Sequence, residues 1–150
     1  MTPIFKQGRL ILSGCLVVNG QDEVLLLYKT EHNHYETPGG KVEAEECANP
    51  SEPTLEDLAH TAERETHEEL GEDLHLSELV YFGAAEFIIP GGQRGIAHKF
   101  LTRILLGQPS IREPEKFLKL EYLPLKDLEN YPLSPDLRQL APRLRALSTP

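Results

Sequence analysis

The sequence contains no run of apolar residues that approaches the roughly 20 needed for a membrane-spanning helix. Its first residues also lack the basic, apolar and small-residue pattern of an export signal. We therefore expect a protein that is neither exported nor held in a membrane, and we place it in the cytoplasm. Cysteine is scarce as well. Cys15 and Cys47 form no recognisable framework, so both are predicted to be free thiols in a reducing compartment.

Positive charge is in short supply. The 150 residues include 15 Lys and Arg against 24 Asp and Glu, which gives a formal net charge of −9. An extended nucleic-acid surface needs a basic footprint, so we expect no such partner. A phosphorylated small molecule remains compatible, because bound cations can supply positive charge locally. The length fits one domain, and we find no internal repeat, low-complexity segment or second domain.

Acidic residues gather in the segment Arg64–Gly71. Read as a helix, this segment places Glu65, Glu68 and Glu69 at positions i, i+3 and i+4, on one side. Like charges at this spacing repel one another, so a bare helix gains nothing from them. Several carboxylates in one place are what Mg²⁺ or Mn²⁺ requires. The cluster therefore predicts a divalent-metal site.

A solvated acidic helix face is the plainer interpretation, and two features count against it. The acidic residues border an apolar stripe, which places them at the edge of a core. The stripe consists of Leu55, Leu58, Ala59, Ala62 and Leu70. The preceding loop, Pro38–Glu43, holds two consecutive glycines, and a glycine backbone can approach a ligand closely.

These residues resemble the signature of the Nudix hydrolases, G-x5-E-x7-R-E-U-x-E-E-x-G-U, where U is aliphatic. The second half matches at Arg64, at the three glutamates and at Gly71, whereas Thr66 and Glu72 stand where aliphatic residues are usual. The resemblance implies an α/β fold of the Nudix type, which is an α/β/α sandwich with a mixed β-sheet, in a single domain over residues 1–150. It also implies an enzyme that depends on Mg²⁺ or Mn²⁺.

The sequence does not decide which glutamate matches the first Glu of the signature. Counting forward from Gly40 gives Glu46, and counting back from Arg64 gives Glu56. Seventeen residues separate Glu46 from Arg64 where the signature has seven, so ten are extra. The turn-forming residues in Cys47–Leu55 favour a longer loop at this point, followed by an unbroken helix.

Around this motif the sequence predicts alternating strands and helices. Arg9–Val18 and Glu23–Tyr28 are predicted to form a hairpin through the turn Asn19–Asp22. Further strands are expected at Tyr35–Thr37, Leu74–Phe82, Ala84–Ile89 and Ile96–Leu106, with a hairpin loop at Pro90–Gly95. A mixed sheet between helices follows from this order of elements.

Helix ends can be predicted from capping residues. Thr54 and Asp57 predict a capping box at the start of the central helix. A short terminal helix is predicted to begin after Ser134, to be interrupted near Pro142 and to carry no chemistry. In the last predicted strand, alternation places His98, Phe100 and Thr102 on one face and Lys99, Leu101 and Arg103 on the other.

The resemblance also implies roles for particular residues. Arg64 would orient a ligand carboxylate, and a carboxylate that the metal does not fully occupy would act as general base, with Glu65 and Glu115 as candidates. Glu115 belongs to a stretch similar to one in some nucleotide-cleaving Nudix enzymes, and Glu113 and Glu121 compete with it. The catalytic candidates are Glu65, Glu69, Glu115 and Arg64, and the candidate metal ligands are Gly40, Glu65, Glu68, Glu69 and Glu115. The candidate substrate contacts are Lys29, Gly39, Lys41, His98 and Lys116.

The implied activity is hydrolysis of a phosphoanhydride bond in a nucleoside diphosphate linked to another group. The Glu113–Lys116 stretch favours a nucleoside triphosphate or related nucleotide. Two alternatives stay open: a nucleotide-sugar pyrophosphatase, including one acting on ADP-ribose-like compounds, and a nucleotide-binding or regulatory module without hydrolysis. A Nudix-fold isomerase would need a reactive cysteine in its pocket, for which Cys47 is a poor candidate. The expected partner is a small-molecule nucleotide, and the resemblance leaves a homodimer open.

Overall fold

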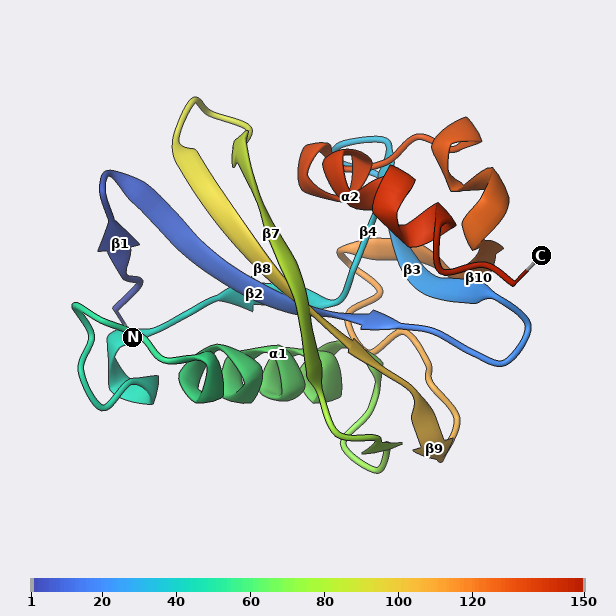
Figure 1. The fold of residues 1–150 in the computed structure, drawn as a ribbon, viewed down its shortest axis with the longest axis horizontal. Coiled ribbons are helices and arrows are strands. Elements are labelled where there is room, and N and C mark those ends of the chain that lie inside the picture. Colours follow the sequence, from blue (N-terminus) through green and yellow to red (C-terminus); the bar gives the residue numbers. More distant parts are fainter. Residues whose placement is uncertain (1, 150) are drawn as a thin grey trace.

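The structure, a computed structural model, describes residues 2–149. Two helices enclose a layer of strands: α1 (Leu55–Leu70) lies along one face, and α2 (Pro135–Arg145) packs over the other (Figure 1). The strands are β1 (Phe5–Lys6), β2 (Arg9–Val17), β3 (Glu23–Lys29), β4 (His34–Glu36), β5 (Gly39–Lys41), β6 (His75–Leu76), β7 (Val80–Ile88), β8 (Arg94–Thr102), β9 (Ile104–Leu106) and β10 (Phe117–Pro124). Two 3₁₀ turns complete the chain, η1 (Ala44–Glu46) and η2 (Leu125–Asn130). The predicted α/β/α arrangement is confirmed.

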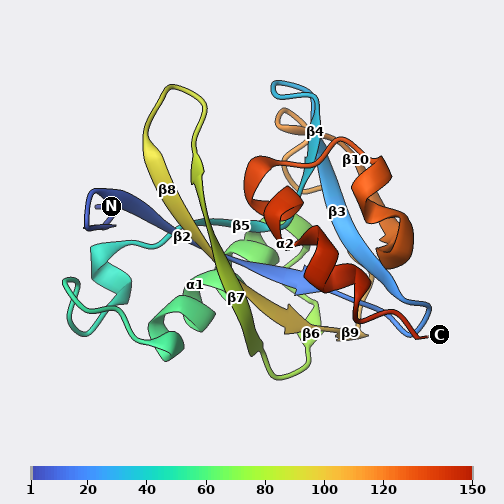
Figure 2. The same cartoon turned by 45° about the horizontal axis from the view of Figure 1, so that its top comes forward.

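The main sheet is built on β2. Its strand order is β1-β2-β8-β7, and β5 also pairs with β2. The strands β2 and β8 are parallel, with Leu12 opposite Ala97, whereas the other pairs are antiparallel. The sheet is therefore mixed, as predicted. A three-stranded sheet, β10-β3-β4, and the short pair β6-β9 lie beside it (Figure 2).

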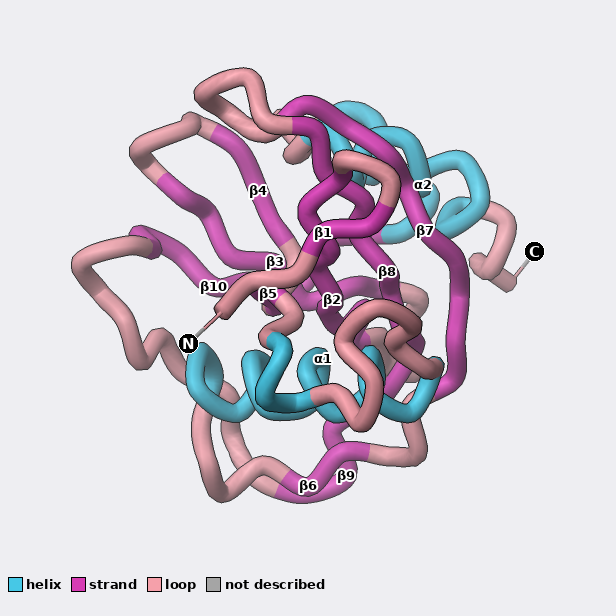
Figure 3. Tube along the Cα trace, turned by 90° about the vertical axis from the view of Figure 1, so that its left-hand side faces the viewer, coloured by secondary structure: helices cyan, strands magenta, loops and turns pink. Residues whose placement is uncertain are grey.

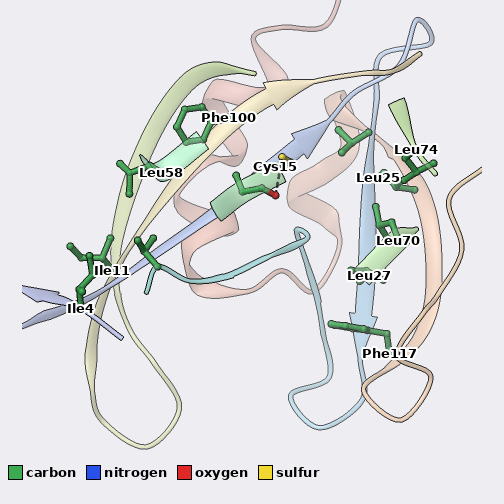
Figure 4. Packing of buried hydrophobic residues seen from close by; sticks show 13 residues of the cluster. Ile4, Ile11, Cys15, Leu25, Leu27, Leu58, Leu70, Leu74, Phe100 and Phe117 are labelled. Carbon is green, nitrogen blue, oxygen red and sulfur yellow. Dashed lines mark hydrogen bonds between the residues drawn. The ribbon is translucent and has the colours of Figure 1, made fainter. Parts of the chain in front are cut away.

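The core is divided in two by the alternating side chains of β2. Ile11 and Cys15 belong to a cluster on the α1 side, together with Leu58 of the helix and Phe100 of β8 (Figure 4). Leu16 belongs to a second cluster, which includes the buried leucines of α2. Because β2 is covered on both faces, its sequence is a nearly continuous apolar run. Figure 3 shows these layers from the side, with the strands between the two helices.

The capping box predicted for α1 is confirmed. The Thr54 hydroxyl accepts a hydrogen bond from the Asp57 N–H at 3.1 Å, and the Asp57 carboxylate accepts one from the Thr54 N–H at 2.9 Å. Gly71 ends the helix with a φ of 140°. Leu55 does not join the apolar stripe, because it is 56 % exposed. No helix in residues 2–149 is both long and apolar enough to cross a bilayer.

The prediction that β2 and β3 pair with each other in a hairpin is wrong. The turn forms, with a bridge between Val18 and Val24, but the two strands then separate. β2 pairs with β8, and β3 pairs with β10 and β4. β8 occupies one edge of β2 from Leu10 to Val17, while β1 and β5 occupy most of the other edge as far as Gly14, so little of β2 is left for β3.

Three predicted boundaries also differ from the structure. The segment before Pro90 forms the short β6 and one continuous strand, β7, whose register shifts beside Gly83. The last predicted strand breaks at Arg103, because β9 turns away to pair with β6. The terminal helix continues through Pro142, since buried leucines on both sides of the proline hold α2 against the sheet.

Candidate active site

Glycines bring the loop before α1 against the helix. Gly39 of β5 lies opposite Gly14 of β2, and a Cβ atom at Gly39 would lie 2.8 Å from the Gly14 Cα. A Cβ atom at Gly40 would lie 2.4 Å from the carboxyl carbon of Glu65. Only glycine leaves room for these approaches. The backbone of the loop therefore rests directly on the Glu65 side chain.

Glu69 is the most deeply buried member of the acidic cluster, with 7 % of its surface exposed. One of its carboxylate oxygens accepts a hydrogen bond of 2.8 Å from the Gly39 N–H. Burial raises the pKa of Glu69 to about 8, and the charges of Glu65 and Glu113 add to the rise. A buried carboxylate among other carboxylates is a site that a cation would stabilise.

Arg64 links the other two carboxylates. Its Nη1 lies 3.2 Å from Glu65 Oε1 and 3.0 Å from Glu68 Oε1. Burial raises the pKa of Glu65, and the charges of Glu68 and Glu113 act in the same direction, whereas Arg64 opposes them. Arg64 therefore holds two of the three predicted metal ligands in place.

The same guanidinium identifies the first glutamate of the signature. Arg64 donates from Nε to Glu46 Oε2 at 2.7 Å and from Nη2 to Glu46 Oε1 at 2.9 Å, which is a two-pronged contact. The Thr61 hydroxyl donates to Glu46 as well, at 3.1 Å. Glu56 is exposed in the first turn of α1. Glu46 thus fills the role, and the extra residues form a loop before an unbroken helix, as predicted.

The segment after β9 is fastened to the end of α1. The Ser110 N–H donates to the Leu70 carbonyl at 2.9 Å, and the Arg112 N–H donates to the Glu69 carbonyl at 3.1 Å. This attachment carries the following residue, Glu113, close enough for its charge to raise the pKa of Glu69, in addition to the larger effect of burial.

The placement of Glu113 bears on which glutamate completes the cluster. Glu115, the candidate carried over from the resemblance, is exposed, and its charge is not among those that raise the pKa of Glu65 or Glu69. Glu121 accepts a hydrogen bond from the Tyr35 hydroxyl instead. The geometry therefore favours Glu113, which the sequence analysis ranked as a competitor.

The Gly39–Gly40 loop also lines a cavity of about 210 Å³. Lys29 and Lys41, two of the predicted substrate contacts, line the same cavity. The cavity lies against the α2 side of the main sheet, where Leu12 and Ala97 form part of its wall and the first residues of α2 close it. The acidic cluster and the cavity therefore share one loop.

Two of the predicted substrate contacts lie elsewhere. His98 projects from the opposite face of β8, where its Nδ1 is hydrogen-bonded to the Tyr81 hydroxyl at 2.9 Å. It does not line the cavity. Lys116 lies beside the acidic cluster, with its Nζ 3.2 Å from Glu113 Oε2, and the bond to Glu113 raises its pKa.

Several polar residues of the cavity were not predicted as site residues, among them Thr37, Lys99 and Asp136. A signal was present for Lys99, because alternation sets it on the face opposite Phe100, inside a strand predicted to be covered on both sides. Asp136 follows the Ser134–Pro135 helix start and was read only as part of that start. Nothing local to the sequence indicated that these residues meet.

The residues of the cluster suit a hard divalent cation. Three carboxylates and the Gly40 carbonyl offer oxygen ligands, and the raised pKa of Glu69, caused first by burial, marks a site that lacks positive charge. Within residues 2–149, no three His, Cys, Asp or Glu side chains already converge in ligand geometry. Arg64 Nη1 contacts only the Oε1 atoms of Glu65 and Glu68, so the second oxygen of each carboxylate remains for a cation.

Comparison with known proteins identifies the family. A sequence model of the NUDIX domain matches residues 9–144. The chain belongs to the Nudix family. This confirms the prediction of a Nudix hydrolase that was made from the residues around Arg64. No curated protein sequence matches the chain.

Solved structures of Nudix proteins have the same fold. A MutT NUDIX hydrolase from Burkholderia pseudomallei has a TM-score of 0.70 at 23 % identity, over 92 % of this chain and 97 % of that chain. A C. elegans Ap4A hydrolase has a TM-score of 0.65 at 19 % identity, over 91 % and 95 % of the two chains. An E. coli dihydroneopterin triphosphate pyrophosphohydrolase has a TM-score of 0.64 at 18 % identity, over 97 % and 99 %.

The close contact at Gly40 predicts a large effect of a small side chain. We expect Gly40→Ala to lower kcat/KM by at least about 10-fold, because its Cβ would displace the Glu65 carboxylate. The melting temperature should change little, since the Glu65 carboxyl end can move aside. Gly20→Ala is the matched control, because a Cβ atom there would have no neighbour nearer than 4.0 Å. Wild-type kinetics in the Gly40 variant would show that Glu65 need not lie on the loop.

Proposed function

We propose that this Nudix protein hydrolyses a phosphoanhydride bond in a nucleoside diphosphate linked to another group, with a nucleoside triphosphate or related nucleotide as substrate. The observation that carries the proposal is the shared Gly39–Gly40 loop, which borders the buried carboxylates and also lines the cavity. A nucleotide whose ring occupies the cavity extends its phosphates along this loop toward the cluster.

The roles follow from the position of each residue. Glu65, Glu68, Glu69 and the Gly40 carbonyl would hold Mg²⁺ or Mn²⁺. When bound, such an ion neutralises phosphate charge and lowers the pKa of water. Arg64 positions two of these carboxylates, and Lys41 and Lys116 present ammonium groups to the phosphate chain.

A carboxylate must take the proton of the attacking water. Glu65 was one candidate from the sequence, and Glu113 replaces Glu115 as the other. Both lie in the acidic cluster, and burial raises the pKa of Glu65, which makes this carboxylate a stronger base than an ordinary glutamate. Glu113 carries an ammonium partner, Lys116, 3.2 Å away.

Two departures from the signature had favoured a module without hydrolysis, and neither disturbs the cluster. Thr66 is buried, and its hydroxyl donates to the Ala62 carbonyl at 2.7 Å, so it fits where an aliphatic residue is usual. The inserted loop leaves α1 unbroken from Leu55 to Leu70. The catalytic interpretation is therefore preferred.

The test is product analysis of purified protein with Mg²⁺ or Mn²⁺ across a substrate panel. The panel contains nucleoside triphosphates, nucleotide sugars, ADP-ribose and dinucleoside polyphosphates. We expect release of a nucleoside monophosphate and pyrophosphate from triphosphates. Cleavage of nucleotide sugars or ADP-ribose alone would move the assignment to the nucleotide-sugar alternative. Nucleotide binding without any cleavage would support the regulatory module.

Two further predictions concern the surroundings of the protein. The homodimer can be tested by light scattering of the purified chain. The cytoplasmic location remains a prediction, and the thiols of Cys15 and Cys47 are both free, as expected in a reducing compartment.

A further inference from the structure

The floor of the cavity holds a buried ion pair. Lys99 Nζ lies 2.8 Å from Asp136 Oδ2 and 2.5 Å from Thr37 Oγ1. These three residues come from β8, from the start of α2 and from the segment after β4, and each is at most 8 % exposed. All three line the cavity. A buried charge pair is costly unless it has a specific use, and this pair lies in a cavity that also holds Lys29, His34 and Glu36.

The surroundings of Asp136 favour its carboxylate form. Burial alone would raise the pKa of Asp136, but the Lys99 ammonium and the Ser134 hydroxyl lower it below the usual range of a carboxyl. The floor therefore presents an ammonium and a carboxylate side by side, with no net charge. A ligand that fits this floor carries no charge on the edge that faces it. That edge offers one hydrogen-bond donor and one acceptor.

The remaining hydrogen-bonding capacity of the floor can be counted. Lys99 has three N–H donors, and its bonds to Thr37 and Asp136 use two of them. The Thr37 oxygen accepts from Lys99, and its own proton has no acceptor among residues 2–149. The Asp136 carboxylate accepts only. Two donors, and the acceptor sites of the Asp136 carboxylate that Lys99 and Ser134 do not use, are thus available to a ligand within one small area.

The walls favour a flat ring. Leu10, Leu12, Phe87, Ile89 and Ala97 contribute apolar surface to the cavity. A carbonyl oxygen has two lone pairs and can accept from both donors of the floor, whereas an aromatic ring nitrogen has one. An N–H next to that carbonyl would donate to Asp136. This combination is a lactam, the adjacent C=O and N–H of an oxo-substituted heteroaromatic ring.

We propose that Lys99, Thr37 and Asp136 form a reader of the lactam edge of the substrate ring, so that the protein selects oxo-substituted over amino-substituted bases. In the same pose an amino-substituted base would set its NH₂ against the Lys99 N–H and its ring nitrogen against the Asp136 carboxylate. Both contacts are repulsive, and each leaves a buried group unpaired. The inference depends on the proposed hydrolysis only where kcat/KM is the quantity measured.

Matched substrate pairs test the reader. ITP and ATP differ in whether this edge is a lactam or its amino-substituted counterpart, and so do UTP and CTP. We expect wild-type kcat/KM to favour the oxo member by at least about 10-fold in the pair whose ring size fits the cavity. Equal kcat/KM within both pairs would overturn the inference, and it would leave the proposed hydrolysis intact.

Variants connect the preference to these residues. Thr37→Val keeps the shape and the ion pair but removes one donor, and it should reduce the preference by about 3-fold or more. The double variant Lys99→Met/Asp136→Leu removes both charges together, which preserves folding better than breaking the pair. It should abolish the preference. Arg145→Met is the control: Arg145 lies at the far end of α2 from Asp136, its substitution breaks a 2.7 Å ion pair with Glu129 of η2, and it should leave the preference unchanged.

A binding readout separates this inference from the proposed hydrolysis. Melting curves are recorded with IMP, AMP, UMP or CMP, in EDTA. Stabilisation by an oxo member but not by its amino partner supports the reader even if no triphosphate is cleaved. Equal stabilisation within both pairs counts against it, as does a Thr37→Val or double variant that folds and retains the wild-type preference.

Discussion

Glu69→Gln is expected to abolish turnover while raising the melting temperature of the metal-free protein. Glu69 is a predicted cation ligand, so its loss should lower kcat by at least about 10³-fold. The same carboxylate is buried near Glu65 and Glu113, and a neutral amide removes this repulsion. The amide oxygen can still accept the Gly39 N–H, so the loop keeps its place. Activity with Mg²⁺ and thermal melting in EDTA measure the two effects.

The control for this variant is Glu63→Gln, an exposed glutamate of the same helix. It removes the same charge from α1 without touching the cluster, so both activity and melting temperature should stay near wild type. Full activity in the Glu69 variant would place the metal site elsewhere in the molecule. A lowered melting temperature in EDTA would show that the buried carboxylate is not a source of repulsion.

The raised pKa of Glu69 also predicts how stability depends on pH. Burial first, and neighbouring charges second, raise this pKa from 4.5 to about 8, so the folded state holds a proton that the unfolded chain releases. The stabilisation is complete at low pH and is lost as pH rises from about 4.5 to about 8. The free energy of unfolding in EDTA should therefore fall over this range, and Glu69→Gln should remove most of the slope. Added Mg²⁺ should stabilise the wild type more at pH 8 than at pH 6, because the ionised carboxylate is the ligand. Equal slopes in the two proteins would contradict the assignment.

The helix α1 and its acidic cluster were predicted from local sequence patterns. The capping box at Thr54, the glycine pair and the spacing of the three glutamates each depend on residues a few positions apart. Such patterns can be recognised in a sequence because helix geometry and the small size of glycine affect residues that are close together in the chain. They were sufficient to predict one acidic helix face preceded by a loop whose backbone can approach a ligand closely.

Pairing between distant segments could not be predicted in this way. A turn at Asn19–Asp22 predicts a hairpin, yet β2 pairs with β8 along one edge and with β5 over part of the other, while β3 pairs with β10 and β4. The choice of Glu46 over Glu56 depended on where the Arg64 guanidinium points, which a residue count cannot decide. The cavity floor depends on β8 and α2 meeting, so Lys99 and Asp136 gave no joint signal.

The same limit explains the two glutamates of the 113–115 segment, for which we predict opposite outcomes. Glu113→Gln should lower kcat by about 10²-fold, because this side chain lies in the electrostatic field of Glu65 and Glu69 and is a candidate for the water's proton. Glu115→Gln should remain within about 2-fold of wild type, since its side chain is exposed and outside the cluster.

The Glu115 variant is also the control for Glu113, because it makes the same substitution two residues away on the same fastened segment. The contacts that fasten the segment are backbone bonds to Leu70 and Glu69, so neither variant should shift the melting temperature by much. A pH–rate profile adds a second readout: loss of a general base removes the acidic limb, whereas loss of a merely structural contact leaves it. If Glu115→Gln were the inactive variant, the segment would have to rotate when substrate binds. Glu115, which the resemblance implied, would then be the functional carboxylate in place of Glu113.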